Sequence, residues 1–194
     1  LVHSEGDNLP GLIIDIYGKT AVVQAQTEGM ALNVKNISEA LLKVDGLKID
    51  SVYNKSSEAM QRMGKDAVED GYLFGEKSDE FVLENDSKFL IDWEEGQKTG
   101  FFLDQRYNRD LVRQLAKGKN VLNTFCYTGG FSVTALKGGA NKVVSVDCSK
   151  KAISACEKNI ALNGFDIKEK KKAKTAETPG LSVRLVRRFG TIKV

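Results

Sequence analysis

The sequence predicts an α/β protein in which a small α+β (ββαββ) domain precedes half of a parallel α/β domain. Two apolar runs, 121–122 and 143–146, have the composition of buried strands. Gly129 and Gly130 follow the first run and permit a tight turn into a helix. Apolar residues recur at helical spacing after both runs, which gives the order strand, helix, strand, helix. This order is typical of a Rossmann-like sheet.

The first 84 residues alternate short apolar strands with one helix. Two apolar runs on either side of Gly18 have the pattern of a β-hairpin. The sequence therefore predicts a central α+β domain over residues 1–84, in the order strand, strand, helix, strand, strand. Its predicted elements are strands over 12–16, 21–25, 49–53 and 80–83 and a helix over 28–44.

The following residues, 85–167, form the predicted partial Rossmann-like domain, and 168–194 form a divergent basic tail. Within the tail, only the run 181–186 has the composition of a strand. The elements predicted upstream of the glycine turn are strands over 88–93 and 99–103 and a helix over 104–117, with Leu111, Val112 and Leu115 facing inwards.

Two polar features fall at the carboxyl ends of the predicted parallel strands, where open α/β sheets bind ligands. The turn 123–130 can bring backbone N–H groups close to a ligand, and Thr128 and Ser149 are the predicted N-caps of the two helices. Asp147 ends the second strand and can accept two hydrogen bonds from a ribose diol. The turn lacks the G-x-G-x-x-G pattern of nicotinamide-binding folds, so S-adenosylmethionine is the candidate ligand. A plain turn and a helix-capping aspartate remain the alternative.

The charge of the chain is unevenly distributed. The net charge is +3, but residues 168–194 hold nine Lys or Arg and two Asp or Glu, so the rest of the chain is mildly acidic. Global charge is therefore no argument for RNA binding. Three cysteines and one histidine lack metal-ligand spacing, which argues against a metal site. With no apolar run of 18 residues and no signal-peptide pattern, we expect no membrane span and a cytoplasmic protein.

Three segments, in order, resemble one protein family and together cover about Leu1 to Gly164. They resemble the class I S-adenosylmethionine-dependent 23S rRNA (cytosine-C5) methyltransferases of the PUA-containing type. The resemblance implies S-adenosylmethionine as cofactor and ribosomal RNA as partner. The three segments are EGDNLPGLIIDIYG (Glu5–Gly18), GQKTGFFLDQRYNR (Gly96–Arg109) and FCYTGGFSVTAL with the later VVSVD and KNIALNG.

The resemblance also implies site residues. Asp147 would hold the ribose, Asn163 would lie near the adenine, and the FLDQR run would pack around the methionine end. The polar stretch 54–75 would face the RNA, which makes Lys55 and Arg62 candidates for phosphate contacts; ordinary surface charges are the alternative. The implied cofactor-binding residues are Phe102, Asp104, Gln105, Arg106, Asn123, Phe125, Tyr127, Thr128, Gly129, Asp147 and Asn163.

The resemblance is expected to stop after Phe165, without the family's Asp-Pro-Pro strand end or its catalytic cysteine. Methylation of C5 normally needs a thiolate that attacks C6. Because Cys126, Cys148 and Cys156 lie in the cofactor half, we assign no catalytic residue. We expect a chain truncated at both ends, by a frameshift or an early stop, and inactive. The alternatives are a non-catalytic RNA-binding fragment with a basic tail and an inert product, while the missing glycine pattern disfavours a nicotinamide enzyme. The oligomeric state is not predicted.

Overall fold

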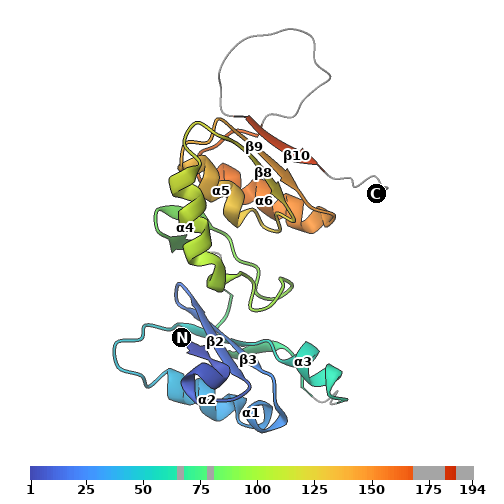
Figure 1. The fold of residues 1–194 in the computed structure, drawn as a ribbon. Helices are drawn as coiled ribbons and strands as arrows, with labels where there is room; N and C mark the ends of the chain where they lie inside the picture. Colours follow the sequence, from blue (N-terminus) through green and yellow to red (C-terminus); the bar gives the residue numbers. More distant parts are fainter. Residues whose placement is uncertain (65–67, 78–80, 168–181, 187–194) are drawn as a thin grey trace. The chain divides into compact units, whose positions relative to one another are not determined.

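The structure is a computed structural model that describes residues 1–64, 68–77, 81–167 and 182–186 (Figure 1). The chain divides into two compact units. The first unit holds Leu1–Val82 and Ile91–Phe102, and the second holds Leu83–Leu90 and the residues from Leu103 onwards. The segment 91–102 therefore belongs to the first unit, although it follows residue 84 in the chain.

The first unit is built on a five-stranded sheet in the order β1-β2-β3-β4-β5. The predicted hairpin is confirmed: β2 and β3 are antiparallel, and Tyr17 pairs with Thr20 across a two-residue turn. Gly18 takes a positive φ of 60° in that turn, a conformation that favours glycine. The strands are β1 (Val2–His3), β2 (Leu12–Tyr17), β3 (Thr20–Ala25), β4 (Ser51–Asn54) and β5 (Gly71–Phe74).

One face of this sheet is covered by helices. The helix predicted over 28–44 is present as α1 (Glu28–Leu32) and α2 (Val34–Leu41), which are separated at Asn33. A short helix, α3 (Ser57–Arg62), follows β4. Alternating strand residues and the inner face of α2 form one core because their apolar side chains meet on that face. The core residues are Leu12, Ile14, Ala21, Val23, Val34, Leu41 and Val52.

The fourth strand of this sheet was predicted at the wrong place. The strand that completes the sheet is β5, which lies in the stretch 54–75 that was expected to be polar loop. The apolar run predicted as strand 80–83 is found as β6 (Val82–Glu84), which pairs with β7 (Ser87–Phe89) in a separate two-stranded sheet. Few residues in this part alternate between apolar and polar, so tertiary pairing decided which run joins the sheet.

The prediction of strands over 88–93 and 99–103 is wrong apart from β7, because residues 90–102 are irregular. Gly100 has a φ of +117°, and a Cβ there would lie 2.8 Å from Ile91 Cγ2. Side-chain hydrogen bonds replace a strand ladder: the Thr99 hydroxyl donates to Asp15 Oδ2 at 2.5 Å and lies 2.9 Å from the Tyr17 hydroxyl oxygen. Packing against β2 therefore fixes this segment in the first unit.

Lys55, a candidate phosphate contact, instead has a structural position. Its ammonium group donates to three backbone carbonyls, those of Trp93, Glu94 and Gly96, the last at 2.6 Å. An ammonium group has three donors, so these carbonyls can occupy all of them. Lys55 thus ties the end of β4 to the irregular segment and is not a phosphate ligand in this arrangement.

We expect Lys55→Met to lower the free energy of unfolding of the first unit by about 1–3 kcal/mol, because three partly buried carbonyls lose their donor. Urea unfolding followed by the fluorescence of Trp93, the only tryptophan, measures this loss. Lys48→Met, at an exposed position, is the matched control and should change stability little. Equal midpoints for the two variants would contradict the structural role of Lys55.

The second unit contains the predicted parallel sheet, in the order β10-β9-β8. The strands are β8 (Asn120–Thr124), β9 (Lys142–Val146) and β10 (Ser182–Val186), and both pairings are parallel. Two helices follow the first two strands: α5 (Gly130–Lys137) and α6 (Lys150–Leu162). The strand–helix–strand–helix prediction is confirmed, and so is a strand within 181–186. Among the described residues of this unit, the fully buried apolar ones are Phe89, Val133, Ala135, Ala140, Val143, Ile153, Cys156 and Ile160.

The helix predicted over 104–117 is present as a short 3₁₀ turn (Leu103–Gln105) and α4 (Arg106–Leu115), but its orientation was predicted wrongly. Leu111 and Leu115 are 52% and 65% exposed, whereas Arg109 on the same helix is 2% exposed. The Arg109 guanidinium is paired with the carboxylate of Glu84 at 2.5 and 2.6 Å. A buried ion pair, which apolar periodicity cannot reveal, sets the inner face of α4.

Candidate cofactor site

The functional candidate in the second unit lies where the parallel strands β8 and β9 end. Thr124 and Val146 are register partners at the ends of these strands, and the Cys126 N–H donates to the Val146 carbonyl at 2.9 Å. The turn 123–130 and Asp147 therefore lie side by side at the carboxyl edge of the sheet. This is the location at which open α/β sheets bind ligands.

Asp147 is bonded directly to the turn. Its Oδ2 accepts the Tyr127 backbone N–H at 2.8 Å, and its Oδ1 accepts the Ser149 backbone N–H at 2.9 Å. Each carboxylate oxygen has two lone pairs, so one acceptor position remains on each after these two bonds. The half-buried carboxylate can thus organise the turn and still accept hydrogen bonds from a diol.

The backbone of the turn is locally strained. Phe125 and Tyr127 have positive φ values of 59° and 48°, which residues other than glycine rarely adopt. Gly129 has a φ of 86°, and a Cβ on it would lie 2.4 Å from Cys156 Sγ. Left-handed residues held by surrounding structure are frequent in ligand-binding loops. Here the strain aims the Tyr127 N–H at Asp147.

Thr128 was predicted to cap α5, and this prediction is wrong. The N-cap is Gly129, and no side chain makes a capping bond at that end. Thr128 is only 7% exposed, and within the described residues its Oγ1 has no hydrogen-bond partner. A buried hydroxyl without a partner is costly, so a ligand that bonds to it would be favoured. The second predicted cap is confirmed, since Ser149 Oγ accepts the Ala152 N–H at 3.2 Å.

Asn159 is a supporting residue that the sequence analysis missed. Its side chain is fully buried; the amide nitrogen donates to the Thr128 carbonyl at 3.0 Å, and the amide oxygen accepts the Leu90 N–H at 2.8 Å. Asn159 therefore fixes the turn against the segment that follows β7. The sequence contains one indication of this supporting role, namely a polar amide at an inward-facing position of a helix.

Two asparagines predicted to bind the cofactor, Asn123 and Asn163, make hydrogen bonds within the protein. Asn123 donates to Ser132 Oγ at 2.8 Å, which ties the start of the turn to α5. Asn163 exchanges two hydrogen bonds with the backbone of Lys88, at 2.9 and 2.7 Å. These contacts hold β7 against the end of α6, and a role of Asn163 beside an adenine stays a prediction.

The FLDQR run is divided between the two units, because the boundary along the chain falls after Phe102. Phe102 belongs to the first unit, where the Lys98 ammonium lies 4.6 Å from its ring centroid. Asp104, Gln105 and Arg106 begin α4 in the second unit, and Arg106 Nε lies 3.5 Å from Glu84 Oε2. That these residues contact the methionine end of S-adenosylmethionine stays a prediction.

The buried Cys126 thiol, which lies in the turn, is a poor nucleophile. A hydrogen bond with Cys156, together with burial, raises the pKa of the Cys126 thiol. Only a thiolate attacks an electrophilic ring carbon, so a raised pKa removes Cys126 from that role. Among residues 1–64, 68–77 and 81–167, no three His, Cys, Asp or Glu side chains are grouped to hold a metal.

A glycine turn and an aspartate lie here at adjacent strand ends of a parallel sheet, the place at which α/β sheets of this class bind ligands. The sequence model of the S-adenosylmethionine-dependent methyltransferases matches residues 57–174. The chain therefore belongs to this family. The match extends nine residues beyond Phe165, where the resemblance was expected to stop.

Relatives of this chain are named as ribosomal RNA methyltransferases. Ribosomal RNA large subunit methyltransferase I of Aeromonas hydrophila is 41% identical over 169 residues, which are 86% of this chain and 42% of the relative. A protein of Methanocaldococcus jannaschii assigned as a ribosomal RNA large subunit methyltransferase is 46% identical over 167 residues, 85% of this chain and 42% of the relative. The chain thus spans less than half the length of these relatives.

Solved structures share the fold. A protein of Streptococcus mutans assigned as an S-adenosylmethionine-dependent methyltransferase has a TM-score of 0.73 and 28% identity, over 93% of this chain and 44% of that one. The structure of SMU.776, assigned as a methyltransferase and complexed with SAH, has a TM-score of 0.74 and 27% identity, over 94% of this chain and 44% of that one.

In the described part of this chain, no helix is long and apolar enough to span a membrane.

Proposed function

We propose that this chain supplies the S-adenosylmethionine-binding part of a methyltransferase that acts on cytosine C5 of large-subunit ribosomal RNA in the cytoplasm. The observation that carries the proposal is the bond between the Tyr127 N–H and Asp147, which joins the turn to the acid at one sheet edge. The names of the relatives support ribosomal RNA as the substrate class.

The residues of the site fit the cofactor chemically. The remaining acceptor positions of Asp147 suit a ribose diol, and the buried Thr128 hydroxyl lacks a partner within the described residues. The absence of a side chain on Gly129 keeps the turn close to α6. When bound, the cofactor supplies a methyl group on a sulfonium centre. The protein binds and orients it, while the raised pKa of Cys126 argues that this thiol does not activate the base.

Asp147→Asn tests the cofactor site. The substitution removes the charge and one acceptor, so we expect S-adenosylmethionine binding to weaken by about 1–3 kcal/mol, or roughly 5- to 150-fold. Isothermal titration of both proteins measures the change. Asp166→Asn, at an exposed position, is the matched control and should bind as the unaltered chain does. Unchanged affinity in Asp147→Asn would show that the carboxylate only links the turn to α6, and no heat with the unaltered chain would refute the proposal.

A second function, RNA binding without catalysis, is favoured by the basic residues of 168–194, of which the structure describes only 182–186. Phosphate binding by these residues would make RNA affinity strongly dependent on salt. Replacing Lys170, Lys171 and Lys172 by glutamine should then weaken RNA binding and leave cofactor binding unchanged. We also expect no methyl transfer to ribosomal RNA by this chain alone, and measured turnover would overturn that expectation.

A further inference from the structure

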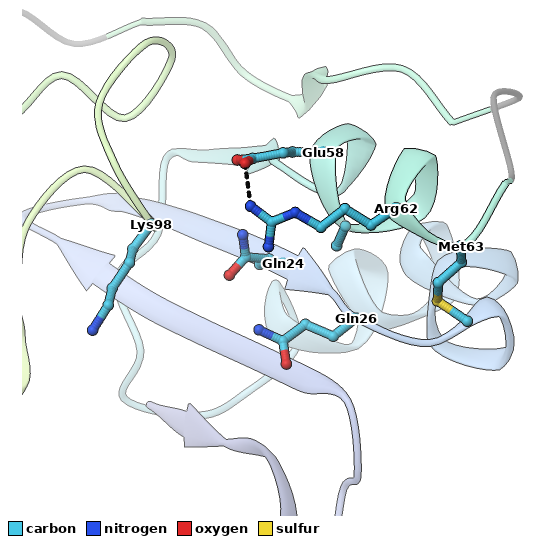
Figure 2. A pocket seen from close by; sticks show the side chains of 7 residues that line it. Gln24, Gln26, Glu58, Arg62, Met63 and Lys98 are labelled. Carbon is cyan, nitrogen blue, oxygen red and sulfur yellow. Dashed lines mark hydrogen bonds and ion pairs between the residues drawn. The ribbon is translucent and has the colours of Figure 1, made fainter.

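The first unit has a hollow of about 380 Å³ on its surface, built from three separate stretches of chain. β3 and the residue after it contribute Gln24 and Gln26, and the irregular segment contributes Lys98. The other lining residues come from α3 and the residue after it: Glu58, Ala59, Arg62 and Met63. Figure 2 shows Lys98 on one side and Met63 on the other, with the two glutamines and the Arg62 guanidinium between them. The volume is within the range of small-molecule sites.

The lining combines the groups that recognise a nucleotide. The primary amides of Gln24 and Gln26 each offer a donor and an acceptor, the pattern that pairs with base edges. Met63 is 51% exposed, and its flexible, polarisable thioether can pack on the face of a base. An amide pair beside an exposed apolar side chain suits a base better than an inorganic anion.

The two cations of the hollow are held by weak contacts that a phosphate can displace, Arg62 by Glu58 and Lys98 by the Phe102 ring, whose centroid lies 4.6 Å from the Lys98 ammonium. Arg62 is paired with Glu58 one helical turn earlier, and both side chains are more than 70% exposed. Such exposed pairs are weak, so the guanidinium can exchange the carboxylate for a phosphate, which it binds with two parallel hydrogen bonds. Lys98 has a positive φ of 50°, an uncommon conformation that packing must enforce. The two cations outnumber the single acid of the lining.

We propose that this hollow binds one nucleotide of a single-stranded RNA substrate, with Arg62 and Lys98 on its phosphates and Gln24 and Gln26 on its base. The inference rests on the proposed function for the RNA itself, because a free mononucleotide would offer similar groups. RNA is favoured because residues that carry amides, a thioether and two cations line one open hollow, which a continuous strand can cross.

The test is the binding of a fluorescein-labelled single-stranded 12-nucleotide RNA to the full chain, measured by anisotropy at several salt concentrations. The variant Arg62→Gln/Lys98→Asn removes both cations; asparagine is chosen because it tolerates a positive φ. We expect about tenfold weaker binding at low salt, and a slope of log K against log salt that is smaller by about 1.4, since each lost phosphate contact contributes about 0.7. Gln24→Leu should weaken binding at equal slope, because it changes no charge.

Lys35→Gln/Lys43→Gln is the matched control, since it removes two exposed charges of the same unit away from the hollow. An equal loss in the control would overturn the assignment of the hollow, and so would unchanged binding in Arg62→Gln/Lys98→Asn. Competition by adenosine monophosphate at the same concentration of phosphate groups would also overturn it, in favour of a free nucleotide. Titration of the same variants with S-adenosylmethionine separates the two proposals. A variant of the hollow that loses RNA binding but still binds the cofactor bears on the hollow and leaves the proposed cofactor site unaffected.

Discussion

Substituting alanine for Gly129 is expected to lower the free energy of unfolding of the second unit by about 2–5 kcal/mol. About 1–2 kcal/mol comes from placing a side chain at a positive φ, and about 1–3 kcal/mol from forcing a methyl group into a packed contact. The new Cβ would lie 2.4 Å from Cys156 Sγ on α6. Because relief of this contact must displace the turn, binding of S-adenosylmethionine should weaken as well. Urea unfolding followed by circular dichroism and isothermal titration measure the two effects.

Gly164→Ala is the control that separates strain from crowding. Gly164 has a φ of +79°, close to that of Gly129, but a Cβ there would meet nothing within 4 Å. It should therefore show only the conformational cost, about 1–2 kcal/mol, and normal cofactor binding. If the two variants lost equal stability, the contact between Gly129 and Cys156 would have no energetic weight.

Replacing Arg109 by methionine is expected to destabilise the second unit by about 3–5 kcal/mol, because the carboxylate of Glu84 stays buried without its main partner. The side chains of Arg109 and Glu84 are 2% and 7% exposed, and two short hydrogen bonds join them. Arg106, 3.5 Å from the same carboxylate, offers only partial compensation because its side chain is largely exposed. Thermal unfolding followed by circular dichroism measures the loss.

Two further variants make this prediction specific. Arg113→Met breaks the neighbouring pair with Asp86, whose side chain is 54% exposed, and should cost about 0–1 kcal/mol. Glu84→Gln combined with Arg109→Met removes both charges and should recover part of the stability lost in Arg109→Met alone. If Arg109→Met alone were as stable as the unaltered chain, the pair of Arg109 and Glu84 would contribute no more than a surface contact.

The sequence was sufficient for features that depend on neighbouring residues. The apolar runs around Val121 and Val143 predicted β8 and β9, and the glycines between them predicted the turn into α5. Because parallel strands end at one edge, strand order alone placed the turn and Asp147 together, and the hydrogen bond from Tyr127 confirms this placement. Ser149 as a helix cap followed from local chemistry in the same way.

The predictions that proved wrong concern residues whose interaction partners are distant in the sequence. Residues 90–102 have the apolar content of strands, but bonds between Thr99, Tyr17 and Asp15, 82 and 84 residues apart, hold them in irregular form. Leu111 and Leu115 suggested the inner face of α4, but the pairing of Arg109 with Glu84 turned that face away from them. Propensity describes single residues and their neighbours, so it cannot anticipate these contacts.

The sequence by itself thus determined the strand–turn–helix unit, the position of Asp147 and the family, because each of these depends on short segments of consecutive residues. Only the tertiary structure decided that Asn159 supports the turn, that Lys55 is bound by backbone carbonyls, and that Arg62 and Lys98 line one hollow. The physical reason is that a buried polar group must find a partner wherever the fold supplies one, and that partner is set by three-dimensional proximity.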